Sequence, residues 1–320
     1  MQVAVATDNA ALADMWLPWR ALWHRVPDAL PFLSPSWLKP WWSVFGTGRP
    51  VVATLHNGNG LAGVLPLYRL DGKLLPIGVG ISDYFDVLLA PSAPPDAAQK
   101  LLYAALAAAG TDRCDLPELP EGSRLRDVPP PPAWQADRWG GPPCPALPLK
   151  PVPAIPKGMQ RDLRQARNRA ERAGGWHIER ADAASFPALL DALVRLHGAR
   201  WQGRGEAGAL ADPAVLAFHR VAGPELLAAG LLRLEAVRVH DRITAVIYAL
   251  LSRDRIHFYL SAFDPGSGFE SPGTILLGHM IETAAHEGRR EADFLRGDER
   301  YKYAWGGLDR WNEGRSLVRA

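Results

Sequence analysis

The spacing of apolar residues in the second half of the chain predicts three antiparallel strands, then a helix and a fourth strand. Apolar and polar residues alternate along the strand segments, and short polar turns separate them. The predicted elements are, in order, the strands 232–239, 243–252 and 255–262, the helix 272–287 and the strand 291–295. Ser271 suits the cap position of this helix, and Pro272 suits its first turn.

The first half of the chain repeats this order of elements. The predicted elements are the strands 50–56, 61–69 and 73–79, the helix 97–109 and the strand 112–116. Turns are expected at 57–60 in this half and at 240–242 in the other half. The recurrence predicts two copies of one α/β unit, each built on a mixed, mainly antiparallel sheet.

A proline-rich segment separates the two predicted units. Residues 117–156 contain 13 prolines in 40 positions. Proline lacks the N–H donor and the backbone freedom that a regular helix or a central strand requires. We therefore expect an N-terminal unit at 1–116, an extended linker at 117–156 and a C-terminal unit at 157–320.

Two amphipathic helices are expected before the strands of the second unit. The first, at 157–172, carries six basic and two acidic residues. Its basic face, which includes Arg164, suits a phosphate group, an anionic glycan or lipid, or an RNA backbone, and the alternative is a solvated helix face. The second helix ends its apolar stripe in His197, Arg200 and Trp201. A buried Arg200 would require an anionic partner, whereas His197 is either a base or a core residue.

Composition narrows the class of protein. The 320 residues carry a net charge of +2, so the chain as a whole is no polycation for DNA. Cys114 and Cys144 form no disulfide framework, and no metal-ligand spacing appears. No leader segment and no stretch of about 20 apolar residues is evident, so we expect a cytoplasmic protein without a transmembrane segment. Six of the twelve tryptophans fall within the first 45 residues, where they fill a core or line a groove.

The start of the helix at 272–287 is the strongest candidate for ligand binding. A helix start presents free N–H groups and a partial positive charge, which together suit a pyrophosphate. Gly273 lets a ligand approach the backbone closely, and Ser271 and Thr274 flank it. The alternative is an ordinary helix cap.

A second candidate is the segment 293–306, which combines charges with aromatic residues. General acid–base catalysis of a group transfer needs a base for the nucleophile and an acid for the leaving group. Asp298 or Glu299 suits the base, and Tyr301 or Tyr303 suits the acid. The alternative is an ion-paired cap on the end of the sheet.

With these motifs the chain resembles the GNAT acetyltransferases of the CelD/BcsL type, which are related to the FemAB aminoacyltransferases. The resemblance covers most of the chain. It rests on Pro35-Ser36-Trp37, Trp41-Trp42, the segment 82–86, the basic helix at 161–172, and the segments 196–201, 271–274 and 293–306. It implies an α/β (α+β) fold of two tandem GNAT-like units, with sheets flanked by helices, and an acyl-CoA co-substrate.

The resemblance gives the reaction class but not the acceptor. Together with the motifs it leads us to expect the following function and residue roles. We expect the chain to move an acetyl or other acyl group from acyl-CoA to an amine or hydroxyl of a sugar or cell-envelope-related acceptor. The expected catalytic residues are Glu299, Tyr301, Asp298 and Lys302. The expected donor-binding residues are Ser271, Gly273, Thr274, Tyr259 and Arg164. The expected acceptor-binding residues are Asp83, Tyr84, Asp86, His197, Arg200, Trp201 and Arg296.

Two other functions stay open at the level of sequence. A FemAB-like enzyme would take an aminoacyl group from tRNA, and the basic helix at 157–172 favours it. A degenerate GNAT pair would instead serve as a scaffold in an envelope polysaccharide system. The first unit is expected to be structural or to bind the acceptor, because prolines precede its helix and remove N–H donors.

Overall fold

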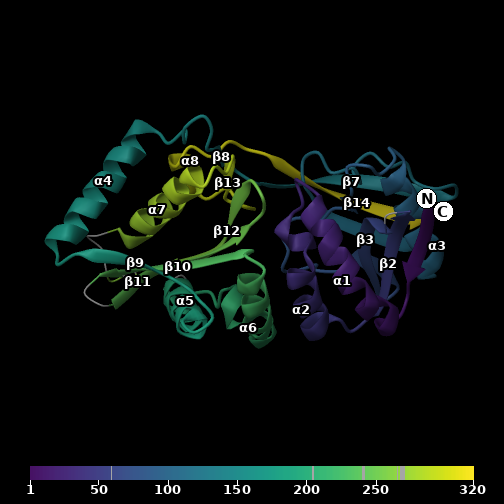
Figure 1. Cartoon of the computed structure of the whole chain (residues 1–320), viewed down its shortest axis with the longest axis horizontal. Coiled ribbons are helices and arrows are strands. Elements are labelled where there is room, and N and C mark those ends of the chain that lie inside the picture. Colours follow the sequence, from purple (N-terminus) through teal and green to yellow (C-terminus); the bar gives the residue numbers. More distant parts are fainter. Residues whose placement is uncertain (59, 204, 240–241, 265, 267–270) are drawn as a thin grey trace. The chain divides into compact units, whose positions relative to one another are not determined.

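A computed structural model describes residues 1–58, 60–203, 205–239, 242–264, 266 and 271–320. The chain forms two compact units, each a sheet flanked by helices (Figure 1). Unit 1 comprises residues 1–143 and 310–320, and unit 2 comprises residues 144–309. The predicted fold class, a mixed α/β fold of two tandem units, is confirmed. Asn59, His240 and Asp241, which belong to the predicted turns, lie outside the described residues.

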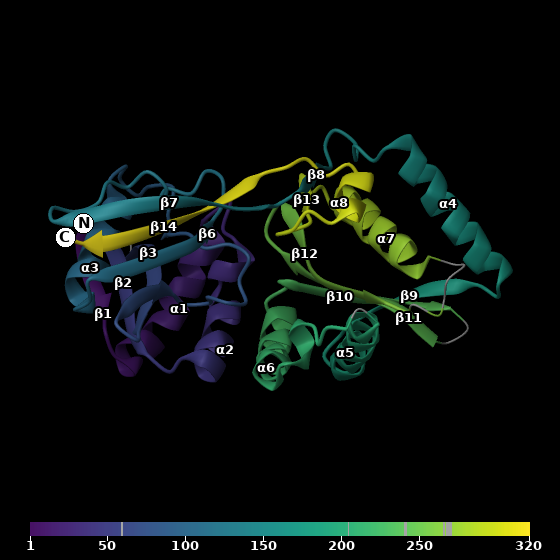
Figure 2. The same ribbon diagram turned by 180° about the vertical axis from the view of Figure 1, so that it is seen from behind.

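Unit 2 is built on a six-stranded sheet in the order β8-β13-β12-β11-β10-β9. Its elements are β8 (Ala146–Pro148), α4 (Lys157–Arg172), β9 (Trp176–Arg180), α5 (Phe186–Gln202), α6 (Pro213–Ala228), β10 (Leu232–Val239), β11 (Arg242–Leu251), β12 (Arg255–Phe263), α7 (Pro272–His286), β13 (Glu291–Asp293) and α8 (Arg300–Ala304). α4 and α7 cover one face of the sheet, and α5 and α6 cover the other (Figure 2).

Unit 1 is built on an eight-stranded sheet in the order β1-β2-β3-β4-β6-β14-β7, with β5 paired to β3. Its elements are β1 (Gln2–Ala6), α1 (Asn9–Arg25), α2 (Pro35–Phe45), β2 (Arg49–Asn57), β3 (Gly60–Leu70), β4 (Lys73–Pro76), β5 (Leu88–Leu89), α3 (Ala97–Ala109), β6 (Arg113–Leu119), β7 (Trp134–Pro143) and β14 (Trp311–Arg319). Trp19, Trp37 and Trp41 are at most 2% exposed, so these tryptophans fill the core beneath α1 and α2.

The two units share one topology, as the recurrence in sequence predicts. In unit 2, β10, β11 and β12 are antiparallel, α7 follows, and β13 returns parallel to β12. In unit 1, β2, β3 and β4 are antiparallel, α3 follows, and β6 returns parallel to β4. None of the described helices is long and apolar enough to cross a membrane.

The division of the chain differs from the boundaries expected from sequence. Part of the proline-rich segment forms β7, which is an edge strand and so tolerates Pro142 and Pro143. The C-terminal strand β14 pairs with β6 on one side and with β7 on the other. Residues 310–320 therefore complete the sheet of unit 1, although they follow unit 2 in sequence.

Asp86 lies in the loop between β4 and β5 of unit 1, and its carboxylate is held by two donors. Oδ1 accepts hydrogen bonds from the Val87 N–H at 2.8 Å and from the Ser123 hydroxyl at 2.7 Å. Burial, the largest effect, raises the pKa of Asp86 to about 7 despite these bonds.

The position of β14 predicts that Leu317 stabilises unit 1. Its side chain is fully buried in the core formed with α3, β2 and β6. Leu317→Ala should lower the free energy of unfolding of unit 1 by about 2–5 kcal/mol, because it leaves a cavity. The neighbouring Val318, which is 39% exposed, provides the control. Val318→Ala should change the same quantity by no more than about 1 kcal/mol in urea unfolding, and equal effects would contradict this strand assignment.

The raised pKa of Asp86 predicts a pH-dependent stability. The folded chain keeps a proton that the unfolded chain, with a pKa near 3.8, releases. The contribution of this proton to the free energy of unfolding is fully present at low pH and is lost as the pH rises through about 7. From about pH 5 to about pH 8, the melting temperature of the wild type should fall relative to that of Asp86→Asn. Asp14→Asn, at an exposed carboxylate, should follow the wild type, and parallel curves for all three proteins would refute the prediction.

Candidate active site

The sheet of unit 2 opens where β12 and β13 separate. The parallel ladder between them comprises three pairs, from Arg255 with Glu291 to His257 with Asp293. β13 ends at Asp293, whereas β12 continues to Phe263. Beyond His257, the side of β12 that faces away from β11 therefore has no strand partner among the described residues.

A cavity of about 430 Å³ lies along this unpaired part of β12. The size falls within the range of ligand sites, which is about 300–1,000 Å³. β12, the start of α7 and one face of α8 provide most of its walls. The described lining residues are Arg200, Ile247, Phe258, Ser261, Ala262, Phe263, Asp264, Ser271, Pro272, Gly273, Thr274, Leu277, Tyr301 and Trp305.

The start of α7, where the sequence predicts a phosphate site, forms one wall. Ser271 occupies the cap position but adopts a left-handed conformation (φ 49°), and its side chain makes no capping bond. Its carbonyl instead accepts the N–H groups of Thr274 at 2.9 Å and Ile275 at 3.2 Å. A Cβ atom at Gly273 would lie 3.4 Å from the Phe263 ring, in ordinary van der Waals contact, so a larger side chain here would meet Phe263 of β12.

Tyr301 and Arg200 bring polar chemistry to a largely apolar cavity. The Tyr301 side chain is 37% exposed. Burial of the remainder is the main cause that raises the pKa of Tyr301 to about 12, Glu299 raises it further, and Arg200 opposes the shift. Tyr301 therefore stays protonated at neutral pH and can act as a proton donor. The Arg200 guanidinium lies 5.1 Å from the centre of the Phe263 ring.

A β-bulge on β12 borders the cavity and involves Tyr259. Tyr248 of β11 pairs with Leu260, and Ala249 pairs with Phe258, so Tyr259 is the extra residue. Its side chain lies near the rings of Tyr248 (6.0 Å) and His219 (5.6 Å) and does not line the cavity. In sequence, Tyr259 lies between the lining residues Phe258 and Ser261.

Of the other predicted catalytic residues, Asp298 and Glu299 precede α8 and Lys302 lies within it. Lys302 is 2% exposed, and its ammonium forms an ion pair with Glu299 at 2.9 Å. Asp298 is exposed and Arg296 is half-buried. Of the residues predicted as catalytic, only Tyr301 lines the cavity.

Three further predicted residues of unit 2 lie outside the lining. His197 is buried against Trp201, with ring centres 5.8 Å apart, and burial lowers the pKa of His197. Arg164 is exposed on α4. The cavity does bring together four of the residues predicted to bind the donor or the acceptor. They are Ser271, Gly273, Thr274 and Arg200.

The predicted acceptor residues Asp83, Tyr84 and Asp86 belong to unit 1. The Asp83 carbonyl accepts a hydrogen bond from Asn312 at 3.1 Å, and Tyr84 packs edge-on against Phe32. Both side chains are buried. Asp86 lines a cavity of about 490 Å³ within unit 1.

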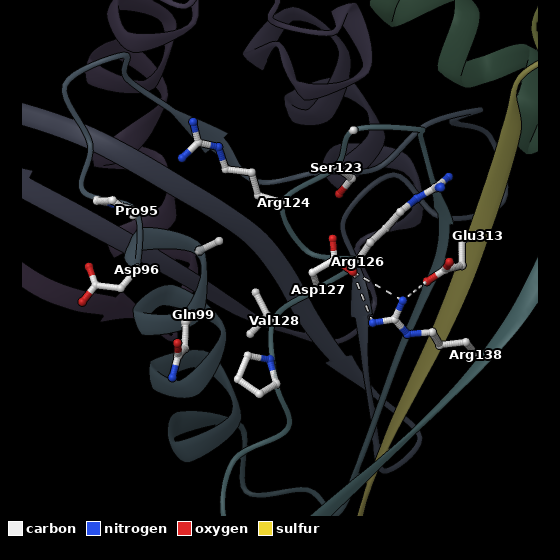
Figure 3. A pocket seen from close by; sticks show the side chains of 13 residues that line it. Pro95, Asp96, Gln99, Ser123, Arg124, Arg126, Asp127, Val128, Arg138 and Glu313 are labelled. Atoms are coloured by element: carbon white, nitrogen blue, oxygen red, sulfur yellow. Dashed lines mark hydrogen bonds and ion pairs between the residues drawn. The ribbon is translucent and has the colours of Figure 1, made fainter.

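Another cavity of unit 1, of about 600 Å³, lies at the start of α3 (Figure 3). Arg138 lies 3.5 Å from the carboxylates of both Asp127 and Glu313, so its charge is balanced. Arg124 and Arg126 extend away from each other in this view and do not converge on one ligand position. None of the residues predicted from the sequence lines this cavity.

Sequence reasoning missed the apolar part of the site in unit 2. Ile247, Phe258 and Leu277 line the cavity, but their spacing along strands and helix is that of ordinary core residues. Phe263 is 38% exposed at the end of β12, and an aromatic residue at a strand end was the one signal in the sequence that could have pointed to it. Among the described residues, no group of three or more His, Cys, Asp or Glu could hold a metal ion.

Comparison with known proteins adds a family match. Residues 157–303 match the family model of the Acetyltransferase (GNAT) domain. This segment includes the whole cavity lining except Trp305. No curated protein sequence matches the chain.

Several solved structures share the fold of the chain. FemX is 11% identical with a TM-score of 0.67, and the match covers 98% of this chain and 97% of that one. L-PGS from Bacillus licheniformis is 12% identical with a TM-score of 0.57, covering 88% and 90%. A tandem GNAT protein from the clavulanic acid biosynthesis pathway is 12% identical with a TM-score of 0.50, covering 98% of each chain. The chain thus has a tandem GNAT-like fold, and its second unit carries a GNAT acetyltransferase-like domain.

Proposed function

We propose that unit 2 transfers an acyl group from acyl-CoA to an amine or hydroxyl of a sugar or cell-envelope-related acceptor. The observation that carries this proposal is the cavity between the unpaired part of β12, the start of α7 and Tyr301. The match of residues 157–303 to the GNAT acetyltransferase domain supports the same reaction class.

The lining of the cavity suits a neutral thioester. Ile247, Phe258 and Leu277 are at most 7% exposed and offer apolar contacts to an acyl chain and its thioester arm. The start of α7, at Gly273 and Thr274, offers the positive end of a helix to a phosphate group of the donor. The apolar contacts thus suit the acyl thioester arm of acyl-CoA, and the helix start suits one of its phosphate groups.

The charges of the described lining residues favour a plain acyl group over an aminoacyl group. Asp264 is the one carboxylate among the described lining residues. Its oxygens already accept the Gly266 N–H at 2.9 Å and pair with Arg242 at 3.2 Å. The ammonium of an aminoacyl donor would require an anionic partner in this cavity and would also meet Arg200. An uncharged acyl group needs no anionic partner and is not repelled by Arg200.

The proposed reaction is a direct attack. The acceptor nitrogen or oxygen attacks the thioester carbonyl carbon, and the carbon–sulfur bond breaks. Backbone N–H groups at the bulge around Tyr259 polarise the carbonyl. Tyr301 gives its proton to the leaving thiolate, and Glu299, through water, takes the proton that the acceptor loses. Proton exchange with solvent then restores the protonated Tyr301 and the ionised Glu299.

The donor assignment predicts that the protein binds coenzyme A and acetyl-CoA in calorimetric titration. Gly273→Trp should abolish this binding, because the indole would fill the space between α7 and Phe263. Gly158→Trp is the matched control and should bind like the wild type. It lies at an exposed position of α4, where a Cβ atom would meet nothing within 4 Å.

Failure of the wild type to bind either ligand would contradict the acyl-CoA proposal. An aminoacyl-tRNA donor would then be tested next, where a steep loss of binding with salt would identify contacts to the RNA backbone. If that donor also failed to bind, the scaffold function would be favoured.

The acid role of Tyr301 predicts a specific kinetic defect. Tyr301→Phe should lower the rate of acyl transfer about 10²–10⁴-fold, because the thiolate then leaves without a proton donor. Donor affinity should stay close to that of the wild type, because the ring is kept. Tyr303→Phe is the control, because Tyr303 is as exposed as Tyr301, at 37%, but does not line the cavity. Equal rates for the wild type and Tyr301→Phe would remove Tyr301 from the mechanism.

A further inference from the structure

The segment between β13 and α8 has a backbone that needs external support. Leu295 has a φ of 58° and Gly297 a φ of 115°, so two residues of this short segment are left-handed. Such a conformation is unfavourable for leucine and persists only where the surroundings hold it. Tyr301 follows directly in the first turn of α8.

Lys302 holds this segment from one side. Its ammonium donates hydrogen bonds to the carbonyls of Leu295 at 3.0 Å, Arg296 at 2.6 Å and Gly297 at 3.2 Å. The Glu299 carboxylate lies 2.9 Å away. Four oxygen atoms thus surround a group with three protons, and the side chain is 2% exposed. The ammonium has no donor left for a substrate.

Asp293 holds the segment from the other side. Its Oδ1 accepts the Leu295 N–H at 2.8 Å, which supports the left-handed turn. Its Oδ2 lies 3.2 Å from Nδ1 of His257, and Nε2 of His257 lies 3.2 Å from the Ser252 hydroxyl. All three side chains are buried. The segment is therefore anchored to the turn between β11 and β12.

We infer that Lys302, together with Asp293, is a positioning residue that fixes the 295–299 segment so that Tyr301 faces the cavity. This inference rests on the proposed function of Tyr301, and it replaces the catalytic role that the sequence suggests for Lys302. Aromatic packing completes the arrangement, since Tyr301 packs edge-on against Phe294, and Phe294 stacks on Phe258 of β12. Removal of Lys302 would leave three carbonyls without their donor and would release this wall of the cavity.

The test places 3-fluorotyrosine at position 301 and follows its ionisation by ¹⁹F NMR. In the otherwise unchanged protein, burial and Glu299 should raise the pKa of the label above that of free fluorotyrosine, with Arg200 opposing. In Lys302→Met the labelled ring, which is 37% exposed in the wild type, should leave the cavity wall and become more exposed, so its pKa should fall toward the free value. Lys157→Met, at an exposed lysine of α4, is the matched control and should leave the pKa of the label unchanged.

Two outcomes would overturn the inference. In folded Lys302→Met, an unchanged pKa of the label, or a higher one, would show that Lys302 does not position Tyr301. Asp293→Asn provides an independent variant should Lys302→Met not fold. It keeps Oδ1 for the Leu295 N–H but gives His257 an N–H in place of an acceptor, and it should shift the label in the same direction by a smaller amount. An unchanged label there would equally count against the inference.

The NMR readout is independent of the proposed reaction. Coenzyme A titrated into the same labelled proteins reports the donor site separately. Weaker binding to Lys302→Met than to Lys157→Met supports the positioning role, because Tyr301 and Trp305 of this wall line the cavity. If no protein binds coenzyme A, the acyl-CoA proposal fails, while the pKa of the label still decides whether Lys302 positions Tyr301.

Discussion

The separation of β12 from β13 is the constraint on which the site of unit 2 depends. Their parallel ladder ends at His257 and Asp293, and β12 continues without a partner on that side among the described residues. A sheet edge inside a domain must be covered, because buried backbone groups require partners. Here α7 and α8 cover it incompletely and leave a cavity along the unpaired side of β12. A ligand with its own hydrogen-bonding groups can pair with the side of β12 that has no strand partner.

Buried polar contacts, rather than apolar packing alone, shape the wall that α8 provides. Burying a lysine is costly unless its charge and its donors are fully compensated. Lys302 meets this condition with three carbonyls and one carboxylate, all from the segment 295–299. The same contacts that satisfy the ammonium fix the path of the chain before Tyr301. The contacts that offset the cost of burying the Lys302 charge are therefore the same contacts that keep this wall of the cavity ordered.

Local patterns predicted the elements of the fold better than their long-range partners. The helices at 97–109 and 157–172 and the strand at 232–239 have the predicted bounds, because apolar periodicity reports local structure. The assignment of β14 to unit 1 was missed, because it depends on pairing with β6 and β7, which lie about two hundred residues earlier in the chain.

The site was predicted in part, for a related reason. Gly273 and Tyr301 stood out because a helix start and a tyrosine among charges have recognisable chemistry. Lys302 resembled its charged neighbours in sequence, and only the three-dimensional contacts distinguish a buried ammonium from a solvated one. The apolar lining at Ile247 and Leu277 has the spacing of core residues, so no pattern could separate the two roles.

The most direct measurement is an experimental structure of the whole chain with a non-hydrolysable acyl-CoA analogue. The account predicts that the acyl carbonyl lies beside the backbone of residues 258–260 of β12, with a phosphate group at the start of α7 and the Tyr301 hydroxyl near the sulfur position. An analogue bound in unit 1, or bound in unit 2 away from β12 and Tyr301, would contradict it.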